Sequence, residues 1–461
     1  MSFRTPVFPL MVALLACIPI SPAFSVETDR PNILLILVDD LGWMDLACQG
    51  NKLVETPRID ALAKQGMRFT NAYAAAPVCS PTRAAILTGH APARLRITNH
   101  LPDQKRFTPD NAKVESAECI DHLAADYETI AERLKETGYS TAFMGKWHVA
   151  QRGNTALFPN AQGFDINIGG CSFGGPPTFF DPYRIPTIKN RQRGEYLPDR
   201  LADEVIGFLN EKQNKPFMLF LWNYTVHWPM EAPQHLLEKY KNRKGRGLND
   251  TRYGAMIEAM DIALGRIFDE LDRLGLTDNT LLIFTSDNGA FGGVGDNRPL
   301  RAEKGYLYEG GIRVPMIVRW PGVVSPNTIS ETPVISTDFY ATIRDAVGLK
   351  PKDGESSDGT SLLPVFKGKT TRSRDLFWHY PNYAFHKRNR PGSAVRAGRY
   401  KLIERFDDGS VELYDLKNDL SETTNLAERK PETAAELKRK LHAWRQSTNA
   451  AIPQPIVSAK P

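Results

Sequence analysis

The sequence contains few cysteines, five in 461 residues, which excludes a scaffold held together mainly by disulfides. It also lacks a strong excess of either charge, since 58 basic and 53 acidic residues leave a formal net charge of +5. So small an excess is not typical of a nucleic-acid-binding protein, although it mildly favours anionic substrates. With 41% hydrophobic and 24% charged residues, the composition excludes a mostly disordered chain and a multi-span membrane protein. The length is typical of one large α/β domain plus a smaller one.

Long apolar runs are absent beyond the N-terminus. There, residues 7–20 follow Arg4 and are mostly apolar, but they are shorter than the roughly 20 residues of a spanning helix. Prolines and small residues follow, up to Ser25. We predict a signal peptide over residues 1–25, and therefore a periplasmic or secreted protein. Residues 14–17 (LLAC) resemble a lipobox, so lipid anchoring through Cys17 stays open as an alternative.

The next three hundred or so residues alternate between apolar runs and amphipathic segments. Continuous apolar runs, typical of strands buried on both faces, occur at 32–38, 140–144, 217–224, 280–285 and 314–319. Helices are expected at 128–136, 200–212 and 251–274. Strands that alternate with helices predict the α/β class, with a doubly wound and mostly parallel sheet.

The pattern changes after residue 348. A polar stretch leads to short alternating segments, which predict antiparallel strands at 394–397, 400–405 and 411–415. Asp408 and Gly409 are typical of a hairpin turn between the last two. A closing helix is expected at 431–445. We therefore predict a main domain over 26–348 and a smaller C-terminal α+β subdomain over 349–461.

Polar side chains stand where four of the predicted strands end. These residues are Asp39, Asp40, Lys146, His148, His227, Asp287 and Asn288. In open parallel sheets, ligands bind beyond the carboxyl ends of the strands. Any one of these clusters could be a simple turn or helix cap. Because four of them follow four strands, we expect them to meet at one edge of the sheet and to form a site.

The acidic members of this set point to a metal ion. Two adjacent aspartates repel each other, and keeping both ionised in a cleft is costly without a cation. Asp39, Asp40, Asp287 and Asn288 offer oxygen ligands only. Ca²⁺ and Mg²⁺ prefer such ligands, whereas a zinc pair normally takes His or Cys. The alternative is a pair of unusually acidic turns.

A further candidate residue is Cys79. Ser80 is a suitable helix cap and Pro81 suits a first helical position, so the sequence predicts a helix that starts beside Cys79 and ends at Gly89. A helix N-terminus favours an anion and lowers a thiol pKa. Cys79 is therefore predicted to be an activated nucleophile beside an anion site, with Arg83 close to the same helical face.

These residues resemble the signature of the type I sulfatases, in the alkaline-phosphatase superfamily. Cys79-x-Pro81-x-Arg83, followed by LTG at 87–89, matches the characteristic motif of the family. Further matches occur in the family's order, at 32–40, 145–148 (GKWH), 227–229, 286–289 (SDNG) and the lysine-bearing loop 299–315. The resemblance covers most of residues 30–345. It departs from the family at Glu303, where small residues are frequent before the lysine; we expect Glu303 to point outward.

The resemblance implies that a maturation enzyme oxidises Cys79 to formylglycine (3-oxoalanine). The hydrate of this aldehyde has two hydroxyls, of which one attacks sulfur and the other later expels sulfate. The resemblance also implies a Ca²⁺ ion, with Mg²⁺ as the alternative, held by Asp39, Asp40, Cys79, Asp287 and Asn288. If Cys79 is used in this way, at most one disulfide remains possible among Cys48, Cys119 and Cys171.

The resemblance gives the remaining residues roles in the reaction. Arg83 and Lys146 would hold the hydrate in its nucleophilic form. His227 or Lys304 would protonate the departing alcohol, and His148 would take the proton from the second hydroxyl. Lys146, His227 and Lys304 would also contact the substrate. The alternative for each of these residues is a structural histidine or an ordinary surface or paired charge.

These observations predict an exported sulfatase that hydrolyses sulfate esters, with a sulfated sugar or polysaccharide fragment as its substrate. Two alternatives stay open: a phosphonate or phosphate ester hydrolase of the same superfamily, and a non-catalytic binder of sulfated glycans. No nucleic-acid partner and no transmembrane span are expected.

Three loop segments are candidates for the walls of the substrate site, namely 96–105, 169–183 and 378–391. In the third, His379 stands among aromatic and basic residues, and we expect it to lean over the active-site edge and contact the sugar. The alternative is that Trp378 and Tyr380 anchor the small domain to the large one.

Overall fold

The structure is a computed structural model that describes residues 1–3, 30–102, 107–385 and 388–456. Cys17 and all but the first three residues of the predicted signal peptide lie outside these ranges. Within the described ranges, no helix has both the length and the apolar character needed to cross a bilayer. The predictions of a signal peptide and of lipid anchoring stay predictions.

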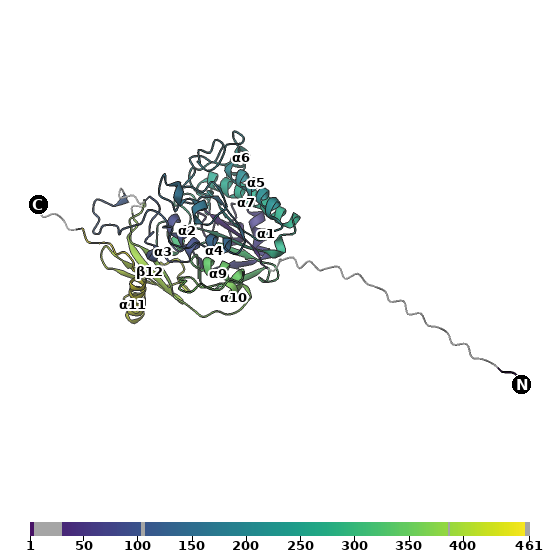
Figure 1. Ribbon diagram of the computed structural model, residues 1–461. Helices are drawn as coiled ribbons and strands as arrows, with labels where there is room; N and C mark the ends of the chain where they lie inside the picture. Colours follow the sequence, from purple (N-terminus) through teal and green to yellow (C-terminus); the bar gives the residue numbers. More distant parts are fainter. Residues whose placement is uncertain (4–29, 103–106, 386–387, 457–461) are drawn as a thin grey trace.

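A mixed eight-stranded sheet forms the centre of the main domain (Figure 1). Its strands, in spatial order, are β5 (Ile166–Ile168), β4 (Ser140–Gly145), β6 (Phe217–Trp222), β1 (Asn32–Val38), β7 (Thr280–Ser286), β8 (Met316–Arg319), β2 (Met67–Phe69) and β9 (Thr328–Ser330). Among these strands β8 alone runs antiparallel to its neighbours. The prediction of a mostly parallel α/β sheet is confirmed.

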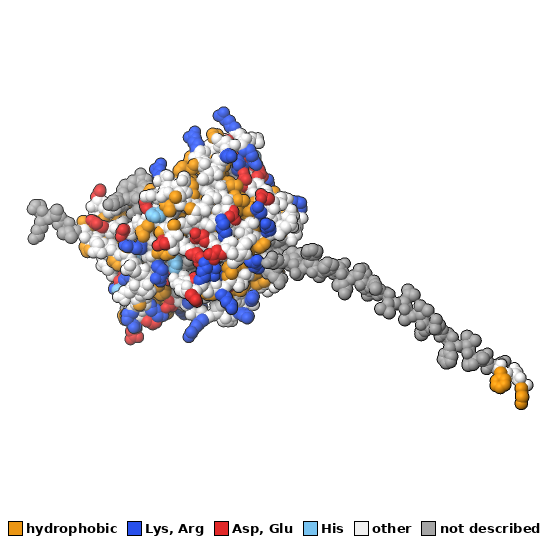
Figure 2. Space-filling view, in the orientation of Figure 1, with side chains coloured by type: hydrophobic (Ala, Val, Ile, Leu, Met, Phe, Trp, Pro, Cys, Tyr) orange, Lys and Arg blue, Asp and Glu red, His pale blue; other side chains and the backbone are white. Residues whose placement is uncertain are grey.

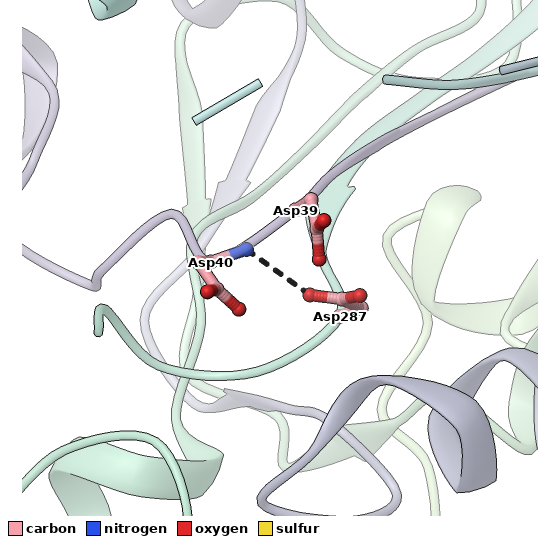
Figure 3. A group of neighbouring side chains, drawn as sticks. All are labelled: Asp39, Asp40 and Asp287. Atoms are coloured by element: carbon pink, nitrogen blue, oxygen red, sulfur yellow. Dashed lines mark hydrogen bonds between the residues drawn. The ribbon is translucent and has the colours of Figure 1, made fainter. Parts of the chain in front are cut away.

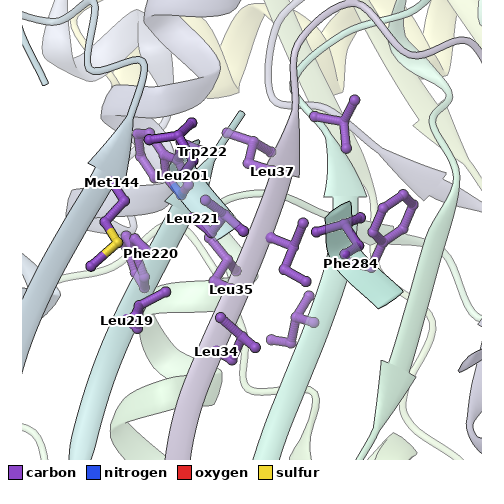
Figure 4. Close-up of a cluster of buried hydrophobic side chains, with 14 of the residues drawn as sticks. Leu34, Leu35, Leu37, Met144, Leu201, Leu219, Phe220, Leu221, Trp222 and Phe284 are labelled. Carbon is purple, nitrogen blue, oxygen red and sulfur yellow. The ribbon is translucent and has the colours of Figure 1, made fainter. Parts of the chain in front are cut away.

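The central strands are apolar along their whole length because helices cover both faces of the sheet. In one group of helices, α7 (Thr251–Arg273) contacts each of the other three, which are α1 (Pro57–Gln65), α5 (Leu197–Lys212) and α6 (Gln234–Tyr240). A second group comprises α2 (Cys79–Thr88), α4 (Ile130–Lys135) and α9 (Asp338–Ala346). Leu35, Phe220 and Phe284 belong to the core that results (Figure 4).

Short elements connect the larger ones. They are β3 (Ala72–Tyr73), which pairs with β10 (Val334–Ile335), the helices α3 (Pro92–Leu95), α8 (Glu309–Ile312) and α10 (Leu363–Phe366), and the 3-10 turns η1 (Ala47–Gln49), η3 (Thr155–Leu157), η4 (Pro159–Gln162) and η5 (Thr277–Asn279).

The C-terminal part contains the predicted antiparallel sheet and helix, but the sheet has a fourth strand, β11, that was not predicted. The strands are β11 (Leu376–Tyr380), β12 (Gly392–Ala397), β13 (Tyr400–Arg405) and β14 (Val411–Asp415), and the helix is α11 (Pro431–Ser447). The predicted turn is present, since the backbone N–H of Ser410 donates to Asp408 Oδ1 over 2.9 Å. Leu437 and Leu441 of α11 pack with Val395 of β12. The exact boundary at residue 348 stays a prediction.

The other face of this small sheet packs against the main domain. Trp378 of β11 is buried, donates from Nε1 to the Ala74 carbonyl over 2.9 Å, and lies edge-on to the Tyr73 ring. Trp378 therefore anchors the two parts to each other. Figure 2 shows basic and acidic side chains interspersed over the visible surface, in keeping with the nearly balanced composition.

Candidate active site

The four predicted polar clusters meet at one edge of the sheet. The strands that carry them, β4, β6, β1 and β7, are consecutive neighbours and all run parallel. Val38 of β1 lies opposite Ser286 of β7, so the register places Asp39 beside Asp287. The order and direction of these four strands therefore explain why the four polar clusters lie together.

Three carboxylates converge there (Figure 3). One oxygen from each of Asp39, Asp40 and Asp287 lies within 4.8 Å of the other two, and all three residues are fully buried. The Asp40 backbone N–H donates to Asp287 Oδ1 over 3.2 Å, and Asn288 Nδ2 donates to Asp40 Oδ1 over 2.7 Å. Asp39, Asp40, Asp287 and Asn288, the four residues predicted to be oxygen ligands of a metal ion, thus lie together.

Each carboxylate has a cationic partner of its own. Lys146 Nζ donates to both oxygens of Asp39, at 2.9 and 2.7 Å. Lys304 Nζ donates to Asp40 Oδ1 over 2.6 Å. Arg83 donates from Nε and Nη2 to Asp287 Oδ2. These three cations are buried, which is tolerable because each is paired.

Two oxygens in this cluster remain unsatisfied. Asp40 Oδ2 and Asn288 Oδ1 are buried and have no hydrogen-bond partner. A buried polar atom without a partner carries a desolvation cost, so such atoms commonly bind an ion or a water molecule. Both are oxygen donors of the kind that Ca²⁺ and Mg²⁺ prefer. The residues present therefore fit a hard divalent cation.

The electrostatics reflect crowding of like charges. Burial is the largest influence on Asp39 and raises its pKa, and repulsion from Asp287 and Asp40 adds to this effect against the attraction of Lys146. Burial is also the largest influence on Asp40 and acts to raise its pKa, but Lys304, His227 and Lys146 together outweigh it and hold the Asp40 pKa below its usual range. The pKa of Lys304 is raised because its nearby carboxylates, Asp40 first, outweigh burial.

Cys79 lies at the first position of α2, where the sequence placed it. The predicted cap is wrong, however: the N-cap is Val78, and Ser80 lies inside the helix, where its Oγ accepts a hydrogen bond from the Leu101 N–H. The prediction of an activated thiol is also wrong for the unmodified residue, since burial raises the pKa of Cys79. Desolvation therefore outweighs the helix N-terminus here.

His148 is positioned against Cys79. Its Nδ1 lies 3.3 Å from Cys79 Sγ, and its Nε2 lies 2.5 Å from the Leu101 carbonyl. A carbonyl can only accept, so Nε2 carries the proton and Nδ1 presents a lone pair to residue 79. Burial, together with Lys146, lowers the pKa of His148 well below its usual value. The neutral ring is therefore set up to accept a proton at Nδ1.

His227 lies near Asp40 of the acidic cluster. Its Nε2 is 3.8 Å from Asp40 Oδ2, and its Nδ1 donates to the Trp228 carbonyl over 2.9 Å. Burial lowers the pKa of His227 to about 3, against the attraction of Asp40. In the absence of substrate, His227 is thus neutral, whereas Lys304 is protonated.

Backbone strain coincides with two of these residues. Asp40 has φ +63° and His148 has φ +57°, the left-handed region that non-glycine residues rarely adopt. Each such residue costs of order 1–3 kcal/mol, and persists only where the surroundings enforce it. The orientation of these two side chains therefore comes at a cost in folding free energy.

Sequence reasoning missed the residues that hold the Lys304 loop. Lys401 of β13 reaches into the main domain and pairs with Glu309, and also with Glu422. Glu422 Oε2 accepts from the Glu309 backbone N–H over 2.7 Å, and Asn389 donates to the Gly305 carbonyl. A lysine within a strand of alternating pattern gives no local signal of such a role. Contacts from the C-terminal part thus hold the loop that carries Lys304 in place.

His379 is the predicted substrate residue that the structure places elsewhere. It is buried in β11, where Nδ1 lies 2.7 Å from Ser393 Oγ and Nε2 lies 2.8 Å from the Ala451 carbonyl. Both ring nitrogens are therefore occupied by the chain itself, and we do not propose His379 as a sugar contact. Its segment is a strand rather than a loop. Within the described part of the chain, Cys48, Cys79, Cys119 and Cys171 are all free, so the possible disulfide is not formed.

The family model Sulfatase matches residues 31–349. The chain belongs to the sulfatase family. It is a type I sulfatase of the alkaline-phosphatase superfamily and therefore a sulfuric ester hydrolase. A second model, N-sulphoglucosamine sulphohydrolase, C-terminal, matches residues 302–447 of this sulfatase.

Individual relatives span nearly the whole sulfatase. A sulfatase of Formosa agariphila is 34% identical, over 91% of this chain and 90% of the relative. An N-acetylgalactosamine-6-O-sulfatase of Bacteroides thetaiotaomicron is 30% identical, over 90% of this chain and 93% of the relative. The crystal structure of Ps i-CgsB has a TM-score of 0.78 at 29% identity and covers 90% of this chain and 93% of its own.

Proposed function

We propose that this sulfatase removes sulfate from a sulfated sugar or polysaccharide fragment, through formylglycine made from Cys79 and with a hard divalent cation, Ca²⁺ or alternatively Mg²⁺. The observation that carries the proposal is the pair of unsatisfied oxygens, Asp40 Oδ2 and Asn288 Oδ1, in a cluster of buried carboxylates. The sugar is supported by relatives: one is named for N-acetylgalactosamine 6-sulfate, and Ps i-CgsB has been solved with a neocarrahexaose.

The cation would be held by Asp39, Asp40, Asp287 and Asn288, together with residue 79. When bound, it would withdraw electron density from the sulfate group and lower the pKa of a nearby hydroxyl. Because three side-chain cations already balance the three carboxylates, a divalent ion would make the site net positive. A site of net positive charge suits a sulfate ester, which carries one negative charge.

The chain's own residues would divide the remaining work. Arg83 and Lys146 orient Asp287 and Asp39, and the charge of each interacts electrostatically with residue 79. Lys304, beside Asp40, would contact sulfate oxygens. The aldehyde of formylglycine, once hydrated, would supply two hydroxyls on one carbon, so that the enzyme can release sulfate without an external nucleophile.

Proton transfer would involve His148 and one of two donors. His148 presents Nδ1 to residue 79 and would accept a proton from a hydroxyl there. The departing sugar alcohol needs a proton, which His227 or Lys304 would supply. His227 is neutral before substrate binds, so it could act as the acid only if the bound anion raises its pKa. Lys304 carries its proton already.

We further propose that the protein is exported through the N-terminal segment and that a maturation enzyme converts Cys79. Mass spectrometry of the peptide around Cys79, from active enzyme, tests the central step. The expected result is loss of the thiol sulfur and its replacement by an aldehyde oxygen. Cys79→Ala should abolish turnover without unfolding the protein. A fully active preparation in which Cys79 is unmodified would overturn the mechanism.

A further inference from the structure

A pocket of about 420 Å³ is lined in part by a loop that packs against the two histidines of the site. Its lining includes Gly174 and Gly175. A Cβ atom at Gly174 would lie 2.7 Å from His148 Nε2, and one at Gly175 would lie 2.8 Å from His227 Nδ1. The imidazoles therefore pack immediately behind these glycines. The volume falls within the range of about 300–1,000 Å³ that is typical of small-ligand sites.

The lining combines an apolar wall with a few polar groups. Phe173 is half-buried and Pro176 is buried, and both border the pocket. Asp121, Gln151 and Arg152 supply exposed polar side chains. Aromatic and apolar surface next to a few hydrogen-bonding groups is the kind of lining that receives a sugar ring.

The two charged side chains of the pocket, Asp121 and Arg152, differ in whether they have partners within the protein. Asp121 is engaged by two neighbours: Gln151 donates to its Oδ2 over 2.9 Å, and His122 Nδ1 lies 2.8 Å from its Oδ1. Arg152, in contrast, makes no ion pair or hydrogen bond with any residue that the structure describes. An arginine presents a planar fork of donors that matches a sulfate or a carboxylate in two-point contact.

We propose that this pocket binds a second unit of the sulfated glycan, next to the unit that loses its sulfate, and that Arg152 pairs with an acidic group on that second unit. The acidic group is the carboxylate of a uronate, which an arginine can contact through two N–H donors. Arg152 is then a specificity-determining residue that favours substrates with two acidic groups. The inference rests on the proposed function, since it names the class of glycan that the same site takes.

The test compares Arg152→Ala, Arg152→Lys and the control Arg429→Ala, an exposed arginine that does not line the pocket. The substrates are 4-nitrophenyl sulfate and two pairs, each a sulfated monosaccharide with the disaccharide that joins it to a uronate. One pair is built on N-acetylgalactosamine 6-sulfate and the other on glucosamine 6-sulfate. A charged hydrogen bond contributes about 1.5–3 kcal/mol, or roughly 10- to 150-fold in kcat/KM.

We expect Arg152→Ala to lose that factor on the preferred disaccharide through KM, and to change turnover of the monosaccharide and of 4-nitrophenyl sulfate less than about twofold. Arg152→Lys should recover part of the loss, and Arg429→Ala should match the wild type. Equal losses on all substrates, no loss on either disaccharide, or a wild-type enzyme that gains nothing from the uronate in either pair would overturn the inference. Failure of the proposed function would appear differently, as a wild type inactive on 4-nitrophenyl sulfate as well.

Discussion

The ammonium of Lys401 lies 2.9 Å from Oε1 of Glu309, and both side chains are fully buried. Lys401 belongs to the C-terminal sheet, whereas Glu309 begins the short helix α8, which follows the Lys304 loop. Glu309 also accepts a hydrogen bond from Tyr73 and faces Arg313. This contact ties the small sheet to a loop of the active site.

Lys401→Met should therefore destabilise the protein. It leaves Glu309 and Glu422 buried without their shared cation, and a broken buried ion pair typically costs about 3–5 kcal/mol. Denaturant unfolding checks this, with Lys430→Met on an exposed site as the control. The double variant Lys401→Met, Glu422→Gln should recover part of the loss. Unchanged stability in the single variant would refute the assigned role.

Chelation should remove activity, and Ca²⁺ or Mg²⁺ should restore it better than Zn²⁺, because all side-chain ligands are oxygens. Asp40→Asn should bind the ion at least roughly 10²-fold more weakly, since it changes a ligand rather than an outer partner. Metal content after dialysis and calorimetric titration measure both effects. Asp353→Asn, in an exposed turn, serves as the control. Full activity in strong chelator with no retained metal would contradict the site.

Gly174→Ala should impair catalysis more than stability. The new Cβ would lie 2.7 Å from His148 Nε2, so the ring or the glycine loop must shift, and the position of Nδ1 against Cys79 changes. A misplacement near 1 Å costs about 10²-fold in rate. The control is Gly207→Ala in helix α5, where a Cβ meets nothing within 4 Å. If kcat on an aryl sulfate is the same in both variants, Gly174 does not position His148.

His227→Ala separates the two candidate proton donors. If His227 protonates the departing alcohol, the variant should lose about 10²–10⁴-fold on a sugar sulfate. It should lose far less on 4-nitrophenyl sulfate, whose leaving group needs no proton. Steady-state kcat/KM on both substrates decides the matter. Equal losses would transfer the role to Lys304.

His379 should make stability depend on pH. Burial lowers its pKa to about 4 from 6.5, with Arg445 of α11 contributing in the same direction. Above pH 6.5 both states are neutral and the stability is complete. As pH falls from 6.5 towards 4, only the unfolded state binds the proton, so the folded state loses up to about 3 kcal/mol. Urea unfolding between pH 7 and 4.5 measures this.

His379→Gln should show a shallower decline over the same pH range, since it cannot take up the proton. The same variant should leave the ratio of activity on a sugar sulfate to activity on an aryl sulfate unchanged. A selective loss on the sugar would restore His379 as a substrate contact.

The sequence by itself determined the strands and much of the site. Continuous apolar runs predicted β1, β6 and β7 because both faces of a central strand are buried, and this pattern is local. The polar residues after these strands followed from the rule that ligands bind at carboxyl ends. The sequence also predicted the helix start at Cys79 correctly, although it did not predict which residue caps the helix.

The tertiary structure alone decided the partners and the protonation states. Lys401 and Glu309 are 92 residues apart, and no local pattern links them. The tautomer of His148 depends on the Leu101 carbonyl, and the high pKa of Cys79 depends on burial by segments from the whole domain. His379 looked like a loop residue because its neighbours are aromatic and basic, yet strand pairing with β12 buried it. Periodicity and turn chemistry are encoded within a few residues, whereas desolvation and long-range pairing arise only when distant segments pack together.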